Sequence, residues 1–222
     1  MNKSDLPIVI SAKRTGSTIL QNIVHIICTG EKGLIEKSHD FFEARSDRKV
    51  IVPIRDPRDT AISLYRTEGT NQKSISKVVD INVFKGHNVL GNVNKMGQMY
   101  NFYKDRDNSL IVRYEDFHSG TLGDYEKIVD TLCNFLEVEN TAKLNDKINE
   151  ILNIDKIKKV SDDLGSFRKY DNHLESAFCI HGNHIESKTV LSWRDRVDTS
   201  IVDELNEFYK NAILDLGYEL WK

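Results

Sequence analysis

The chain begins with a short apolar run, a turn that contains a glycine, and a helical pattern, and this order strongly limits its fold. Residues 6–10 are rich in β-branched side chains and bounded by polar ones, which is typical of a buried strand. The turn covers residues 11–17. From Thr18 onward, apolar residues recur at helical spacing at Ile19, Leu20, Ile23, Val24 and Ile27. A strand, a loop and a helix in this order form a P-loop-like, phosphate-binding unit.

The same order of elements recurs twice. A strand is expected at residues 50–54, with a helix from about Thr60 toward Arg66, and another strand at residues 109–114, with a helix after it. The apolar face of that helix consists of Tyr125, Ile128, Val129, Leu132 and Phe135. Strands that alternate with helices imply a parallel sheet. We therefore expect an α/β fold of three layers with a central parallel sheet, and the length of 222 residues fits a single domain over residues 1–222.

The other segments are less regular. Residues 67–97 are polar, contain four glycines and show only a weak helical pattern at 75–83, which predicts a surface excursion, such as a lid or an insertion that binds a substrate. Residues 140–163 are charged and helical, with an apolar stripe suited to packing. Residues 167–187 look irregular, and a last helix is expected at 199–216.

The turn after the first strand combines cations and hydroxyls at the start of a helix, where free N–H groups and the helix dipole favour an anion. Its residues are Ala12, Lys13, Arg14, Thr15, Gly16, Ser17 and Thr18. The GxxxxGK[ST] spacing of a Walker A loop is absent, which weakens a kinase interpretation. Taken alone, the segment fits an anion site and a purely structural role equally well; in the structural role, the turn needs Gly16 and Ser17 or Thr18 caps the helix.

A second motif follows the strand at residues 50–54. Arg55 closes this strand and Ser63 comes eight residues later in the next helix, so both could reach one phosphate beside the sheet edge. A purely structural interpretation makes Arg58 and Asp59 a solvated helix start and residues 56–57 an ordinary turn. That interpretation does not account for the pairing of Arg55 with Ser63.

With both motifs in this order, the chain resembles the sulfotransferases that use 3′-phosphoadenosine-5′-phosphosulfate (PAPS). The family's phosphosulfate loop, written PKSGTT or PRSGTT, falls on Arg14, Thr15, Gly16, Ser17 and Thr18. The resemblance implies that these residues bind the donor's 5′-phosphosulfate and that Arg14 is the catalytic cation. The family's 3′-phosphate motif, RxPxDxxxS, falls on Arg55, Pro57, Asp59 and Ser63.

A third stretch, residues 112–117, resembles the family's RYEDL strand end and implies that Tyr114 lies near the adenine. The resemblance covers about residues 6–135, and more weakly residues 193–194 and 217–218. The family's RKG segment, which holds the 3′-phosphate, is not cleanly present. Lys188 is the nearest candidate, although Glu186 stands where an arginine would be expected.

The stretch Glu36-Lys37-Ser38-His39 resembles the family's KTH stretch, whose histidine is the general base. His39 is therefore the candidate base, since an imidazole titrates near neutrality and can take a proton from an acceptor hydroxyl. Lys37 could stabilise developing charge. Without the neighbouring motifs, His39 reads as a surface histidine in a loop.

The resemblance implies an enzyme that transfers a sulfonate group from PAPS to a hydroxyl or amine of a small-molecule acceptor by in-line displacement, and that leaves 3′,5′-adenosine bisphosphate (PAP). Two alternatives stay open. One is a P-loop-type small-molecule kinase, which would need magnesium and ATP. The other is a non-catalytic nucleotide-binding protein of the same fold.

The composition of the chain further limits which partners, metals and cellular locations are expected. The formal net charge of −3 argues against general nucleic-acid binding. The three cysteines suit neither a disulfide framework nor zinc, and the pair His181 and His184 is a weak metal signal, so we expect no metal. The N-terminal apolar run is too short for a signal peptide or a membrane span, which favours the cytoplasm and no membrane partner. Residues 188–190 resemble only the start of the dimer motif of the family's cytosolic branch, so the oligomeric state stays open and a homo-oligomer is possible.

Overall fold

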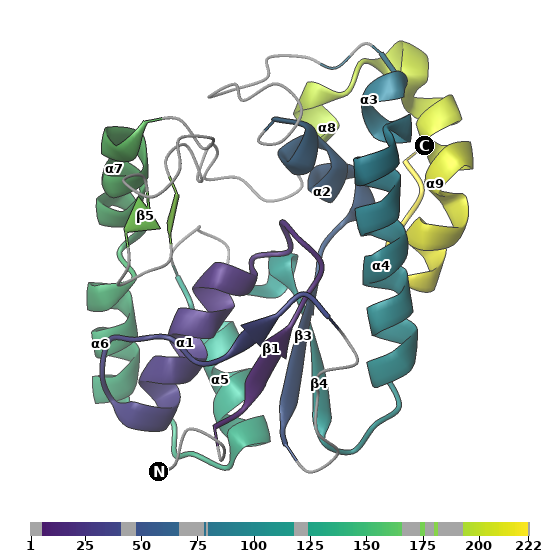
Figure 1. Ribbon diagram of the computed structural model, residues 1–222. Coiled ribbons are helices and arrows are strands. Elements are labelled where there is room, and N and C mark those ends of the chain that lie inside the picture. The colour runs from purple at the N-terminus through teal and green to yellow at the C-terminus, as the bar shows by residue number, and fades with distance from the viewer. Residues whose placement is uncertain are drawn as a thin grey trace.

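In the computed structural model, a sheet of parallel strands lies between layers of helices (Figure 1). The structure describes residues 6–40, 48–66, 78, 80–117, 124–165, 174–175, 180–181 and 193–221. In their order across the sheet, the strands are β2 (Lys37–Ser38), β1 (Ile8–Ile10), β3 (Val50–Ile54) and β4 (Ser109–Arg113). All three neighbouring pairs are parallel. The expected α/β fold with a central parallel sheet is confirmed; the single domain stays a prediction.

The helices follow the strands in the expected alternation. Within the described residues they are α1 (Ser17–Thr29), α2 (Pro57–Leu64), α3 (Asn82–Lys85), α4 (His87–Tyr103), α5 (Glu126–Leu136), α6 (Ala142–Ile151), α7 (Ile154–Leu164), α8 (Trp193–Arg196) and α9 (Val202–Asp215). Two further strands, β5 (Leu174–Glu175) and β6 (Ile180–His181), pair antiparallel. Helices α1 and α5 lie on one side of the sheet and α4 on the other (Figure 1).

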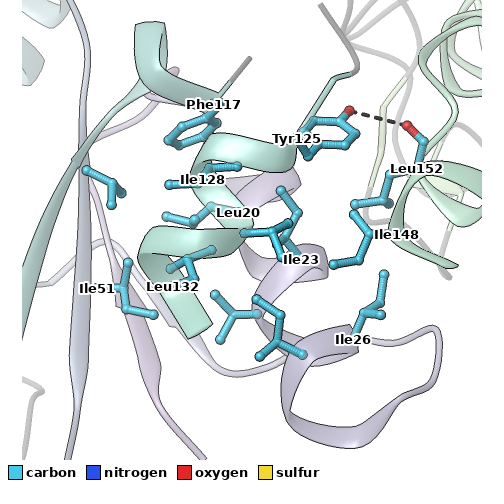
Figure 2. Packing of buried hydrophobic residues seen from close by; sticks show 14 of the residues in the cluster. Leu20, Ile23, Ile26, Ile51, Phe117, Tyr125, Ile128, Leu132, Ile148 and Leu152 are labelled. Carbon is cyan, nitrogen blue, oxygen red and sulfur yellow. Dashed lines mark hydrogen bonds between the residues drawn. The ribbon is translucent and has the colours of Figure 1, made fainter. Parts of the chain in front are cut away.

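Both faces of the sheet are buried because its strands are apolar at successive positions, which point to opposite sides. Val9 and Ile51 pack with α1 and α5, in a cluster that also includes Leu20, Ile23 and Leu132 (Figure 2). On the other face the core of the sheet packs against α4 through Ile8, Ile10, Val50, Val52, Met96 and Met99. The strand ends, where site residues were predicted, are thus fixed by packing from two sides.

The helical segment at residues 140–163 is confirmed as a packing element and is divided in two. Helix α6 ends at Ile151, and the Asn153 side chain accepts a hydrogen bond from Lys156 N–H at the start of α7. Ile148 and Leu152 are buried, and the backbone oxygen of Leu152 accepts a hydrogen bond of 3.2 Å from the Tyr125 hydroxyl (Figure 2).

The expectation of a surface excursion at residues 67–97 was wrong for its last part. Residues from His87 onward belong to α4, which covers one face of the sheet and buries Val93 and Met96. The helical stripe is obscured in the sequence by Gly91 and Gly97, which lie where an added Cβ would meet nothing within 4 Å. Residues 67–77 and 79 lie outside the described part.

Helix α2 also begins earlier than expected, at Pro57 rather than Thr60. Asp56 accepts a hydrogen bond from Arg58 N–H as the N-cap, and Pro57 occupies the first turn, where its missing N–H costs nothing. At the C-terminal end, a 3-10 turn at Thr199–Ile201 precedes α9, in agreement with the predicted last helix. No helix of the described residues is long and apolar enough to cross a membrane.

Candidate active site

The loop between β1 and α1 has the geometry of an anion site. The first backbone hydrogen bond of α1 runs from Leu20 N–H to the Gly16 oxygen, so the N–H groups of Ser17, Thr18 and Ile19 have no intrahelical partner. The N-cap residue is Gly16, which has no side chain that could accept a hydrogen bond from them. These N–H groups and the positive end of the helix dipole face the loop. The Thr15 hydroxyl is not part of this donor set, because it donates to the Ala12 oxygen at 3.0 Å.

Gly16 is required by the close approach of two rings. Its φ is 83°, in the left-handed region, and a Cβ at this position would clash with the ring of Tyr114 and lie 2.9 Å from the ring of Phe117. Tyr114 follows β4 directly and packs against the phosphate loop, which places it beside the residues that were expected to bind the nucleotide.

Three predicted site residues meet at Arg14. Its Nε donates a hydrogen bond of 3.0 Å to Ser63 Oγ in α2, and its backbone oxygen accepts one of 3.3 Å from Arg55 Nη1. Arg14 itself has a φ of 67°, a conformation that costs a non-glycine residue roughly 1 kcal/mol or more. Arg55 and Ser63 thus both contact Arg14, and their binding of one phosphate stays a prediction.

Arg55 is held in a nearly enclosed position. Its guanidinium lies 4.2 Å from the ring centroid of Tyr114 and 3.8 Å from Asp59 Oδ2, and 13% of the side chain is exposed. Burial alone would lower the pKa of Arg55, but the nearby Asp59, Tyr114 and Glu115 raise it, so the group stays charged. Its Nε is buried without a hydrogen-bond partner among the described residues. An orphaned, buried cationic donor suits an anionic ligand.

His39 lies on the other side of the loop, just after β2. Its Nδ1 is 2.7 Å from the Ser11 backbone oxygen. A carbonyl oxygen only accepts, so Nδ1 carries the proton and Nε2 of the neutral ring is a free acceptor. Burial lowers the pKa of His39, as do the nearby ammonium groups of Lys37, Lys13 and Lys95, against an opposing effect of the Ser11 bond. The lowered pKa favours the neutral ring at pH 7.

Lys37 is the first residue of β2, two residues before His39. Its Nζ is 3.5 Å from Thr18 Oγ1 in the first turn of α1. Of the predicted catalytic residues, Lys37 thus reaches the first turn of α1, Arg14 lies in the loop before that helix, and His39 contacts Ser11 at the start of the same loop. Lys188, with its neighbours Glu186 and Thr189, lies outside the described residues.

The interpretation of Arg58 and Asp59 as a solvated helix start was wrong. Both side chains are about 2% exposed, because Trp193 from the C-terminal part of the chain folds over the start of α2. Asp59 Oδ1 accepts a hydrogen bond of 2.8 Å from Trp193 N–H, and the guanidinium of Arg58 stacks 3.8 Å from the Trp193 ring centroid. Asp56 is no ordinary turn residue either, since its carboxylate binds Arg58 at 2.9 and 2.7 Å.

Two more residues near the site were missed. Asn92 of α4 reaches the backbone of Lys13, and Glu115 accepts hydrogen bonds from Asp56 N–H at 3.0 Å and from the Tyr218 hydroxyl at 2.7 Å. Burial raises the pKa of Glu115, and these hydrogen bonds oppose the shift. In the sequence, only the weak resemblance at residues 217–218 pointed to the contact between Tyr218 and Glu115. Among the described residues, no group of three or more His, Cys, Asp or Glu side chains could hold a metal ion.

Comparisons with known proteins agree with this geometry. The chain matches the family model of the sulfotransferase domain over residues 35–217, a range that includes His39, Arg55 and Ser63 but not the loop with Arg14. No curated protein matches the sequence. Among solved structures, the chain is similar to the mouse sulfotransferase SULT7A1 complexed with PAP, with a TM-score of 0.62 and 12% identity over 96% of this chain and 86% of that one. Because the family model covers most of its length, the chain belongs to the sulfotransferase domain family.

Proposed function

We propose that this enzyme transfers a sulfonate group from PAPS to a hydroxyl or amine of a small-molecule acceptor by in-line displacement. The observation that carries the proposal is the meeting of Arg14, Arg55 and Ser63 beside the N-terminus of α1, with His39 on the other side of the same loop. The PAP in the crystal structure of the mouse enzyme of similar fold supports the same donor class here.

The residues present fit such a nucleotide. The N–H groups of Ser17 and Thr18, which follow the Thr15-Gly16 turn, would hold the 5′-phosphosulfate, together with the guanidinium of Arg14. Arg55 and Ser63 would bind the 3′-phosphate, and the unpaired Nε of Arg55 is a donor ready for it. Tyr114 would contact the adenine, and Lys188 is proposed to complete the 3′-phosphate site.

The transfer step requires a base on one side of the sulfur atom of the sulfonate and positive charge on the other side. His39 would take the acceptor's proton through Nε2 while the acceptor oxygen attacks sulfur and the bond from sulfur to the 5′-phosphate oxygen breaks. Arg14, Lys37 and the first N–H groups of α1 would stabilise the negative charge that develops on the transferring and leaving oxygens. PAPS supplies the activated sulfonate; the protein supplies orientation, proton transfer and charge.

Donor binding tests this proposal. In calorimetric titrations we expect PAP to bind without magnesium and far more tightly than ATP or 5′-AMP. Arg55→Ala should weaken PAP binding about 30-fold or more, since removing one partner of a buried charge pair costs roughly 2–5 kcal/mol. Arg106→Ala, which removes an exposed arginine elsewhere, should leave it unchanged. Magnesium-dependent preference for ATP, or no binding of PAP, would refute the proposal.

The pH dependence tests the base. His39 must be neutral to accept a proton, and a histidine is neutral above its pKa. Because the pKa of His39 lies below 6.5, kcat/KM should stay constant through neutral pH and fall only as the pH drops below 6.5. Rate profiles and NMR titration of His39 would measure this. A profile with its acid limb centred above pH 6.5 would contradict the assignment.

A further inference from the structure

Asn92 makes a paired contact with one residue of the phosphate loop. Its Oδ1 accepts a hydrogen bond of 2.9 Å from Lys13 N–H, and its Nδ2 donates one of 2.9 Å to the Lys13 backbone oxygen. The two residues are far apart in sequence, and the Asn92 side chain is 9% exposed. Both backbone polar groups of Lys13 are therefore held by one amide, which fixes the orientation of the two peptide planes on either side of Lys13.

This contact stands next to the strained residue of the loop. Arg14 directly follows Lys13 and has a φ of 67°, a conformation that a non-glycine residue keeps only where its surroundings enforce it. Ser63 binds the Arg14 side chain, and Arg55 binds the Arg14 backbone oxygen, which belongs to the peptide after Arg14. Asn92 adds a constraint on the peptide before Arg14, because it binds both backbone polar groups of Lys13.

The attachment of α4 to the sheet does not need Asn92. Met96 and Met99 already pack against the strands, and Val89 and Val93 join the neighbouring apolar cluster. A buried amide is costly unless it is hydrogen-bonded, and an apolar residue would serve for packing alone. The choice of an amide at this position is thus explained by the loop rather than by the helix.

We propose that Asn92 is a positioning residue for donor binding: it holds the peptide before Arg14 so that the Arg14 guanidinium and the N-terminus of α1 face the 5′-phosphate together. The inference rests on the proposed function, since it assigns the 5′-phosphate end of PAPS to this loop. It predicts that the loss of Asn92 affects recognition of the 5′-phosphate and spares the 3′-phosphate, which Arg55 would bind.

Two nucleotides separate these effects: PAP carries both phosphates, and adenosine 3′-phosphate lacks the 5′-phosphate. We expect Asn92→Ala to weaken binding of PAP about tenfold and binding of adenosine 3′-phosphate less than about twofold, as measured by calorimetry. The matched control is Asn94→Ala, an exposed asparagine of the same helix, which should change neither affinity. Amide exchange measured by NMR should become faster at Lys13 while Ile51 in β3 stays protected.

If Asn92→Ala weakens the binding of both nucleotides equally, the inference is overturned, because the substitution then damages the protein in general. If the affinity for PAP is unchanged, the inference is also overturned, because Asn92 then has no role in donor binding. Should Asn92→Ala not fold, Asn92→Thr keeps an uncharged polar side chain that can make one of the two hydrogen bonds, and it should show a smaller loss confined to PAP. Failure of the proposed function looks different: the wild-type protein itself would then not prefer PAP over adenosine 3′-phosphate and ATP.

Discussion

Replacement of Arg14 with alanine should reduce the rate of sulfonate transfer by about 10²- to 10³-fold, the usual effect of losing one preorganised donor at a site of developing charge. Arg14 is the residue proposed for this role because it lies in the loop just before α1 and its Nε is held by Ser63 at 3.0 Å. The loss should appear mainly in the transfer step. Single-turnover transfer of labelled sulfonate from PAPS measures that step, and calorimetry with PAP measures binding separately.

Two further variants sharpen this test. Arg14→Lys keeps the positive charge but loses the planar fork of donors, so we expect an intermediate rate. Lys13→Ala removes the neighbouring, exposed cation and leaves Arg14 in place, so its effect on the rate should be far smaller. A rate for Arg14→Ala within threefold of the wild type, together with weaker PAP binding, would show that Arg14 binds the donor without assisting transfer.

The elements of the fold were predictable where their signal is local. The strand at residues 50–54 is confirmed over its whole length, because it is a continuous apolar run between polar residues. Helix α4 was missed because glycines and asparagines interrupt its apolar stripe, although its buried side is complete in the structure. Helix α2 was placed too late because the N-cap of Asp56 outweighs the turn character of the residues after it.

The candidate site was predictable from motifs only at the level of single residues. Arg55, Ser63, His39 and Lys37 were assigned from their local sequence, and each contacts the loop between β1 and α1 or the first turn of α1. The contact of Arg14 with Ser63 joins the loop after β1 to helix α2 and depends on how α2 packs, which no local pattern reports. The same is true of Asn92 and Lys13, whose pairing is created by the position of α4 on the sheet.

The burial of Arg58 was likewise unpredictable, because its cover comes from the other end of the chain. Arg58 donates to Asp56, to the Glu219 backbone oxygen at 2.8 Å and to Asn206, and it stacks on Trp193. Arg58 therefore ties the C-terminal residues to the start of α2, directly after Arg55. This buried ion pair lies between the proposed 3′-phosphate donors Arg55 and Ser63 in the sequence.

Asp56→Asn should lower the free energy of unfolding by about 3–5 kcal/mol, because it leaves the guanidinium of Arg58 buried without its carboxylate. Asparagine keeps the shape of Asp56 and an oxygen that can cap Arg58 N–H, so the loss reports the charge rather than the cap. Urea unfolding followed by circular dichroism measures the change. Glu150→Gln, which neutralises an exposed carboxylate on α6, should shift the free energy by less than about 0.5 kcal/mol.

A second substitution distinguishes a lost ion pair from a lost local contact. In the double variant Asp56→Asn with Arg58→Met, no unpaired charge is left in the interior, and methionine can still pack against Trp193. We therefore expect the double variant to be more stable than Asp56→Asn alone, a non-additive result of the kind that contacting residues give. A double variant that is less stable by the sum of two separate losses would mean that Arg58 stabilises the fold through its stacking and backbone contacts, with Asp56 acting only as the cap of α2.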